Sequence, residues 1–284
     1  MNAKLITSLL FLCVFETNVM LAKTKVSIQK ASDKKYISAK AICKGGLELD
    51  YSVSNLLKDS LIVVIPAGWR FNSNGGKNDY QDILVTHEEL LVLRPKQTKM
   101  FDIKGYCCEA TKGGPIKGIP YTIGKMADSS LVLLARYLNT HKTDSNTEQY
   151  SVWAISDGKE TANITSSNDS IAALLRTFVA TVKGEPLPWY TLLKRARVSS
   201  SGQVSDNPIR FKADINYSVP ETCYSYCYIV DANGQKVSEI FGKWLLPENT
   251  AYNANFNVAG LKKGEYKLIL EGKNQFLFEK SFKI

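Results

Sequence analysis

The chain has 284 residues, of which 44% are hydrophobic, so it is long enough for one large or two medium domains. Its 36 Lys and Arg residues outnumber 27 Asp and Glu residues, and the net charge is +9 at pH 7. The basic residues are scattered, with one tight cluster at residues 194–197, and this distribution argues against a nucleic-acid partner. The positive charge either faces an anionic surface or keeps an exported protein in solution.

The first residues predict an export signal. Lys4 provides a short basic start, and the apolar run over residues 5–15 is too short to span a bilayer. We expect cleavage after Ala22, so that residues 1–22 are a signal peptide. No later stretch approaches about 18 uninterrupted apolar residues, and we therefore expect no membrane-spanning segment in the mature chain. The predicted location is secreted or at the cell surface, with the periplasm as an intermediate or alternative.

Residues 25–103 have the pattern of short strands separated by turn residues. Strands are predicted over residues 47–53, 61–65, 83–85 and 90–93, with turns at residues 66–68 and 72–76. This spacing predicts a β-sandwich.

The hydrophobic period then changes to that of helices. The first predicted helix covers residues 129–139 with Asp128 as its N-cap, and the second covers residues 148–155. A third, capped by Asn168 or Asp169, ends at Gly184. A short fourth segment, bounded by prolines, continues to Arg197.

The last part of the chain returns to a period of two. The polar run at residues 199–203 predicts a linker over residues 199–206, and residues 207–284 alternate as strands do, with a hairpin turn at Asn233 and Gly234. We expect an immunoglobulin-like β-sandwich there. The predicted fold is mainly β with inserted helices, and residues 23–198 form its N-terminal domain.

Five cysteines remain after the predicted cleavage, and an odd number leaves at least one thiol outside a disulfide. Cys223 and Cys227 lie four residues apart in a predicted strand, about 13 Å from each other, which is too far for a disulfide unless the strand is bulged. We expect them to be buried apolar residues or free thiols. Cys43 reaches Cys108 if their strands are neighbours, and that pairing would leave Cys107 free.

Two stretches, residues 105–109 and 147–153, carry the residues with the most distinctive chemistry. A thiolate at Cys107 is nucleophilic, and fixing it against the carboxamide of Gln149 raises its effective concentration to roughly 10⁵ M or more. Loss of ammonia would then leave an internal thioester, which a lysine amine or a hydroxyl of a partner could open. Cys108 is the alternative thiol. Three aromatic neighbours are expected to shield the bond from water: Tyr106, Tyr150 and Trp153.

Residues 106–115 and 149–153 resemble the two signatures of bacterial thioester domains, an aromatic-Cys segment and a later Gln-x-Ala-Ile-Trp segment. The resemblance covers about residues 62–157 and implies a covalent surface adhesin that uses Cys107 and Gln149. The chain departs from the pattern at Ser151 and Val152, and a related set of secreted domains shares the turn at residues 65–68 without always keeping the bond. The alternative to a thioester is that Cys107 or Cys108 is a disulfide or core residue and that Gln149 faces solvent.

The C-terminal domain resembles type IX secretion sorting tails and, equally, the immunoglobulin-like domain of flagellar hook-capping proteins. The stretches that carry this likeness are residues 207–208, 215–220, 228–235 and 261–266. The first likeness implies recognition by outer-membrane export machinery. The alternative is a sandwich with a purely structural role.

Conventional catalysis has little support in the sequence. The only histidines, His87 and His141, belong to no metal-binding motif, so we expect no metal, no cofactor, no catalytic residue and no enzyme. A cysteine hydrolase that uses Cys107 and His141 is the enzymatic alternative. The leading hypothesis is a secreted or surface adhesion protein whose ligand is a surface protein or glycan, and the second is a non-catalytic structural or assembly module of the cell envelope.

Overall fold

A computed structural model describes residues 24–74, 80–194, 197–198, 204–205 and 207–284. The predicted signal peptide lies outside these residues, as does most of the predicted linker. None of the helices among the described residues has both the length and the apolar character needed to cross a membrane.

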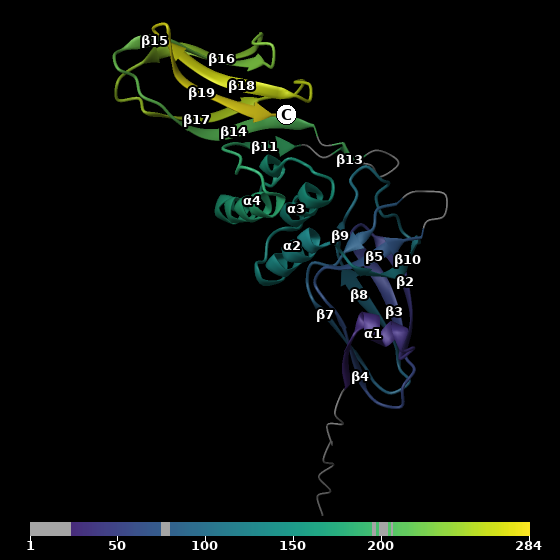
Figure 1. The fold of residues 1–284 in the computed structure, drawn as a ribbon. Coiled ribbons are helices and arrows are strands. Elements are labelled where there is room, and N and C mark those ends of the chain that lie inside the picture. The colour runs from purple at the N-terminus through teal and green to yellow at the C-terminus, as the bar shows by residue number, and fades with distance from the viewer. Residues whose placement is uncertain (1–23, 75–79, 195–196, 199–203, 206) are drawn as a thin grey trace, which may run out of the picture.

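The N-terminal region is a β-sandwich (Figure 1). One sheet has the order β1-β4-β7 and the other has the order β8-β3-β2-β10-β5-β6-β9. Their strands are β1 (Thr24–Ser27), β2 (Ile37–Gly45), β3 (Glu48–Asn55), β4 (Leu61–Ile65), β5 (Trp69–Ser73), β6 (Ile83–Leu84), β7 (Glu89–Leu93), β8 (Thr98–Lys104), β9 (Tyr106–Cys107) and β10 (Pro120–Met126). The core between the sheets contains the fully buried side chains of Tyr51, Trp69 and Phe71.

One helix in this region was not expected from the sequence. Helix α1 (Ile28–Asp33) interrupts the strands directly after β1. Its N-cap Ser27 accepts a hydrogen bond from the amide of Lys30, and Ile28 and Ala31 are buried. The helix has only 6 residues, too few for a visible hydrophobic period, so packing of its two apolar residues stabilises it.

The three predicted helices are confirmed, and Figure 1 shows them between the two β regions. Helix α2 (Ser129–Thr140) is capped by Asp128, and helix α4 (Asp169–Lys183) runs from the N-cap Asn168 to a left-handed Gly184. Helix α3 (Ser145–Ser156) begins three residues earlier than expected, because the carboxylate of Asp144 caps it. The short 3₁₀ helix η1 (Thr161–Asn163) separates α3 from α4.

The C-terminal region is a second sandwich, in which the sheet β11-β14-β17 packs on the sheet β16-β15-β18-β19. The strands are β11 (Thr191–Lys194), β14 (Pro208–Asn216), β15 (Cys223–Asp231), β16 (Lys236–Leu245), β17 (Ala251–Asn257), β18 (Glu265–Gly272) and β19 (Gln275–Lys283), with β12 (Arg197–Val198) and β13 (Val204–Ser205) pairing separately. The predicted hairpin between β15 and β16 is confirmed, and Gly234 adopts the positive φ of 79° that this turn requires. Strand β11 pairs with β14, so this sheet already includes residues ahead of 207. The expected fold class, mainly β with inserted helices, is confirmed.

Candidate functional site

Strand β9 contains Cys107, and Cys108 follows it directly; the strand lies at the edge of the larger N-terminal sheet, where it pairs with β6. Gly105 precedes it because a Cβ at this position would lie 2.4 Å from Ile83 and 2.6 Å from the carbonyl oxygen of Leu84. Only glycine therefore allows β9 to approach β6 so closely. The close packing of β9 on β6 thus explains why glycine stands at position 105, at the start of the stretch 105–109.

The two adjacent cysteines face different sides of the sheet edge, as successive side chains of an extended chain do. Cys107 belongs to the core of the N-terminal sandwich, together with Cys43. Cys108 and Tyr106 belong instead to the core that β9 shares with helices α2, α3 and α4. The expected pairing of Cys43 with Cys108 is therefore wrong: both are free, and their side chains lie in different cores.

Gln149 lies on α3, which packs directly against β9, and it is 8% exposed. The amide of Cys107 donates to Oε1 of Gln149 at 3.0 Å, and Nε2 of Gln149 donates to the carbonyl oxygen of Cys107 at 2.9 Å. The amide of Cys108 points the other way, to the carbonyl oxygen of Asp82. The side chain of Gln149 thus occupies the open edge of β9 where another strand would otherwise bind.

The three aromatic residues assigned to shielding lie on the two elements that make this contact, β9 and α3. Tyr106 and Trp153 are buried, and Tyr150 is half-buried against both neighbouring cores. The rings of Tyr150 and Trp153 meet edge to face with centroids 5.7 Å apart. Trp153 also donates its indole N–H to Oε1 of Gln81 at 3.4 Å. The sequence therefore identified residues that share one region, while the shielding role itself stays a prediction.

Burial controls the acidity of both thiols. Desolvation, with a smaller contribution from Glu109 and then Cys43, raises the pKa of Cys107 to about 12. Desolvation also raises the pKa of Cys108, and the nearby Arg70 opposes this shift. At neutral pH either sulfur is therefore a protonated thiol when it is not covalently bonded.

Each histidine has partners other than these thiols. Nε2 of His87 lies 3.3 Å from Oε1 of Glu148, and the ring of His141 stacks on Tyr137. Nδ1 of His141 also lies 2.9 Å from the carbonyl oxygen of Tyr137. Among the described residues, neither histidine has a hydrogen bond to Cys107 or Cys108, so the geometry that the cysteine-hydrolase alternative requires is not seen there.

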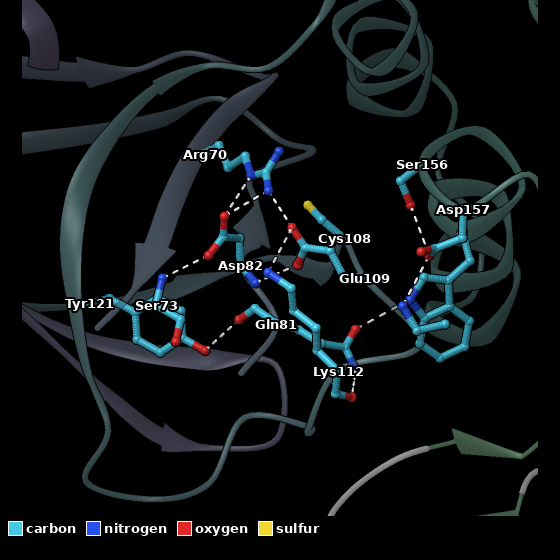
Figure 2. Close-up of polar contacts among 12 residues, drawn as sticks. Arg70, Ser73, Gln81, Asp82, Cys108, Glu109, Lys112, Tyr121, Ser156 and Asp157 are labelled. Carbon is cyan, nitrogen blue, oxygen red and sulfur yellow. Dashed lines mark hydrogen bonds and ion pairs between the residues drawn. The ribbon is translucent and has the colours of Figure 1, made fainter. Parts of the chain in front are cut away.

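The segment after Cys108 is held by an ion-pair network that the sequence did not reveal (Figure 2). Arg70 on β5 donates to Oδ2 of Asp82 at 2.6 Å and also to Oε1 of Glu109. Oε2 of Glu109 accepts from the amide of Asp82 at 2.7 Å, and Oδ1 of Asp82 accepts from the amide of Ser73 at 2.8 Å. Desolvation raises the pKa of Glu109. This network fixes the chain directly beside the tandem cysteines.

Two further contacts secure the same segment (Figure 2). The amide of Ala110 donates to Oδ2 of Asp157, just beyond α3, at 3.0 Å. Nε2 of Gln81 donates to the main-chain carbonyl oxygen of Lys112 at 3.3 Å. The main-chain carbonyl oxygen of Gln81 accepts from the hydroxyl of Tyr121 at 2.9 Å. The loop is thus tied to both α3 and the sheet.

No protein-family model matches this chain, and no curated protein matches it either. Within the described part of the chain, no group of three or more His, Cys, Asp or Glu side chains is arranged to hold a metal ion. The contact between Cys107 and Gln149 is therefore the feature that indicates the chemistry of the site.

Proposed function

We propose that this protein is a secreted or cell-surface binding protein that attaches to its partner covalently, through a thioester between Cys107 and Gln149. The observation that carries the proposal is the pair of hydrogen bonds that hold the Gln149 carboxamide on the peptide of Cys107. The resemblance of both stretches to thioester domains supports the same pair. The partner is a surface protein or a glycan that offers an amine or a hydroxyl.

The bond forms by exchange of sulfur for nitrogen at the side-chain carbonyl carbon of Gln149. Sγ of Cys107 adds to this carbon, the carbon–nitrogen bond breaks, and the thiol proton leaves with the amide nitrogen as ammonia. An amine of the partner later adds to the same carbon. The carbon–sulfur bond then breaks, the sulfur takes a proton from the amine, and an amide joins the partner to Gln149.

Burial favours a long-lived bond before the partner arrives. Water reaches the site poorly, because Cys107 and Gln149 are both buried. The raised pKa of Cys107, about 12, also makes its thiolate a poor leaving group, since thiols of lower pKa leave faster. Both effects slow hydrolysis, and a partner must therefore bind closely enough to displace the covering side chains.

Methylamine trapping tests the proposal, because this small amine opens a thioester and stays attached to the former glutamine. We expect the wild-type protein to incorporate one methylamine at Gln149, as found by peptide mapping. Cys108→Ala is the matched control and should incorporate it equally, whereas Cys107→Ala should incorporate none. Thermal unfolding checks that both variants fold. Absence of label from folded wild-type protein, or equal labelling of Cys107→Ala, contradicts the proposal.

A second candidate is a non-catalytic structural or assembly module of the cell envelope. One observation favours it: the oxygen and nitrogen of the Gln149 carboxamide are both hydrogen-bonded to Cys107, which is also how a purely structural glutamine closes a sheet edge. On this account the protein does not take up methylamine. In either case, the resemblance of the C-terminal sandwich to sorting tails makes outer-membrane export machinery a proposed partner. Its test is whether the full-length chain reaches the cell surface in a strain that lacks that machinery.

A further inference from the structure

The exposed aromatic residues of the protein gather on one face of one sheet. Among the described residues, the large hydrophobic side chains that are strongly exposed include only four aromatic ones, and all four lie on the sheet β16-β15-β18-β19. Their exposed fractions are 42% for Tyr224, 47% for Tyr226, 64% for Trp244 and 61% for Phe276. This sheet lies on the side of the sandwich away from helices α2 to α4 (Figure 1).

Strand register places these rings together. Tyr224 pairs with Trp244 across β15 and β16, while Glu271 on β18 pairs with both Tyr226 and Phe276. The alternate residues of β15 face inward and are buried, so register fixes the tyrosines on the outer face. The ring of Tyr224 meets those of Tyr226 and Trp244 edge to face, with centroids 5.2 and 5.7 Å apart.

Gly242 on β16 makes room for this arrangement. A Cβ there would lie 3.0 Å from the hydroxyl of Tyr224 and 3.2 Å from the ring of Tyr226. With no side chain at Gly242, both rings can lie over β16. The result is a broad aromatic surface, which we call the aromatic platform: Tyr224, Tyr226, Trp244 and Phe276.

A groove of about 990 Å³ adjoins the aromatic platform and combines ring faces with charged groups. The hydroxyl of Tyr228 donates to Oε2 of Glu271 at 2.7 Å, and Nζ of Lys267 lies 2.6 Å from Oε1 of Glu279. Nζ of Lys236 lies 5.1 Å from the ring centroid of Tyr228 and 6.0 Å from that of Tyr226. The groove has four carboxylates and two ammonium groups: Asp231, Glu265, Glu271, Glu279, Lys236 and Lys267.

This mixture of groups selects one class of ligand. A lipid or an apolar protein surface would bury charged groups without adequate hydrogen bonds, at a large cost in free energy. A polyanion would meet more carboxylates than ammonium groups and be repelled. A foreign cation would compete with Lys236, whose ammonium group already lies over the two tyrosine rings.

A neutral sugar ring avoids the conflicts that exclude a lipid, a polyanion or a cation. Its C–H face is apolar and packs on aromatic rings, while its rim of hydroxyl groups both donates and accepts hydrogen bonds. Carboxylates accept those bonds and ammonium groups donate them. We propose that the aromatic platform and its groove bind a neutral glycan. This inference rests on the proposed function only in that the protein binds an external ligand, and it is independent of the bond between Cys107 and Gln149.

A glycan microarray that carries both neutral and acidic oligosaccharides tests the inference, followed by titration calorimetry with the best-bound neutral oligosaccharide. Trp244→Ala and Tyr226→Ala should each weaken that binding by about tenfold or more, since aromatic anchors dominate interfaces. Gly242→Ala should weaken it without removing any ring. Leu174→Ala on α4 is the matched control, because this side chain is also exposed (63%) but lies on a helix, and it should leave binding unchanged.

The outcomes separate this inference from the thioester proposal. Wild-type protein pretreated with methylamine should bind the glycan as untreated protein does, whether or not label is incorporated. Binding to acidic glycans alone, binding to no glycan on the array, or equal binding by the aromatic variants and the control would overturn the inference. Thermal unfolding of each variant verifies that a loss of binding is not a loss of folding.

Discussion

Both sandwiches contain a strand in which tyrosine and cysteine residues are close neighbours, yet the two strands expose different groups. On β9, Tyr106 and Cys107 are both buried, because one side of the strand faces the sandwich core and the other faces the helices. On β15, Cys223 and Cys227 are buried, while Tyr224 and other residues on the opposite face reach solvent.

The difference shows that the layer beside a strand decides what its side chains can do. Where the sandwich core and the helices cover the two sides of this sheet edge, both thiols are kept from water and their pKa values are raised. Where no described element covers β15, the tyrosines are available to a ligand. The first strand is therefore suited to a protected bond and the second to recognition.

Replacing one tryptophan from each region gives the largest expected contrast. Trp153→Ala should lower the free energy of unfolding by about 3–5 kcal/mol, because Trp153 is only 5% exposed and its loss leaves a cavity. Trp244→Ala should change it by no more than about 0.5 kcal/mol. Urea denaturation of both variants measures the contrast. Equal losses would mean that the outer face of β15 and β16 is covered after all.

Removal of Arg70 should have the next largest effect. Arg70→Ala leaves the carboxylates of Asp82 and Glu109 together without their shared cation, at side-chain exposures of only 14% and 18%. We expect a loss of about 2–3 kcal/mol, below that of a fully buried pair because the Arg70 side chain is 30% exposed. Chemical denaturation measures it, with the exposed Arg136→Ala as the control. A loss no larger than that of the control would show that the network does not stabilise the loop.

The smallest effect is a change in the rate of thiol alkylation with pH. In Gln149→Ala, Cys107 must remain a thiol, and its pKa of about 12 lies above the ordinary value of 9.0. Below that pKa the thiolate fraction rises about tenfold per pH unit, so alkylation by iodoacetamide should keep rising about tenfold per unit beyond about pH 9, where a thiol of ordinary pKa levels off. Cys227, whose pKa is also raised to about 12, is the internal reference. A Cys107 rate that levels off near pH 9 would contradict the raised pKa.

In wild-type protein the same experiment should give another result for Cys107. A thioester has no thiol to alkylate, so Cys107 should stay unlabelled at every pH until methylamine opens the bond, while Cys227 keeps its pH dependence. Labelling of Cys107 without methylamine would show that the bond is absent.

Local signals predicted the helices, and tertiary contacts produced what the sequence did not reveal. Asn168 and Gly184 cap α4 through bonds to nearby backbone, so the sequence alone predicted both ends. The Arg70 network joins residues 12 and 39 positions apart, and no local pattern indicates such a contact. Helix α1 is too short for a period, and its packing against the sandwich is likewise visible only in the fold.

The candidate site was likewise predictable only where short stretches of sequence carried the signal. Resemblance of two short stretches paired Cys107 with Gln149, and the structure brings their residues together. The alternative thiol Cys108 directly follows the strand and faces the helices, and this could be seen only once β9 was known to end the sheet. The aromatic platform also needed the register of four strands, because Trp244 and Phe276 are distant from Tyr224 in the sequence.

The intact mass of the mature protein, isolated without exposure to amines or strong base, shows whether the bond between Cys107 and Gln149 exists. We expect a mass lower by one ammonia than that of the unmodified mature chain, and a Cys107→Ala protein without this deficit. A wild-type protein with the full mass would contradict the thioester and leave Gln149 as a structural side chain that closes the edge of β9.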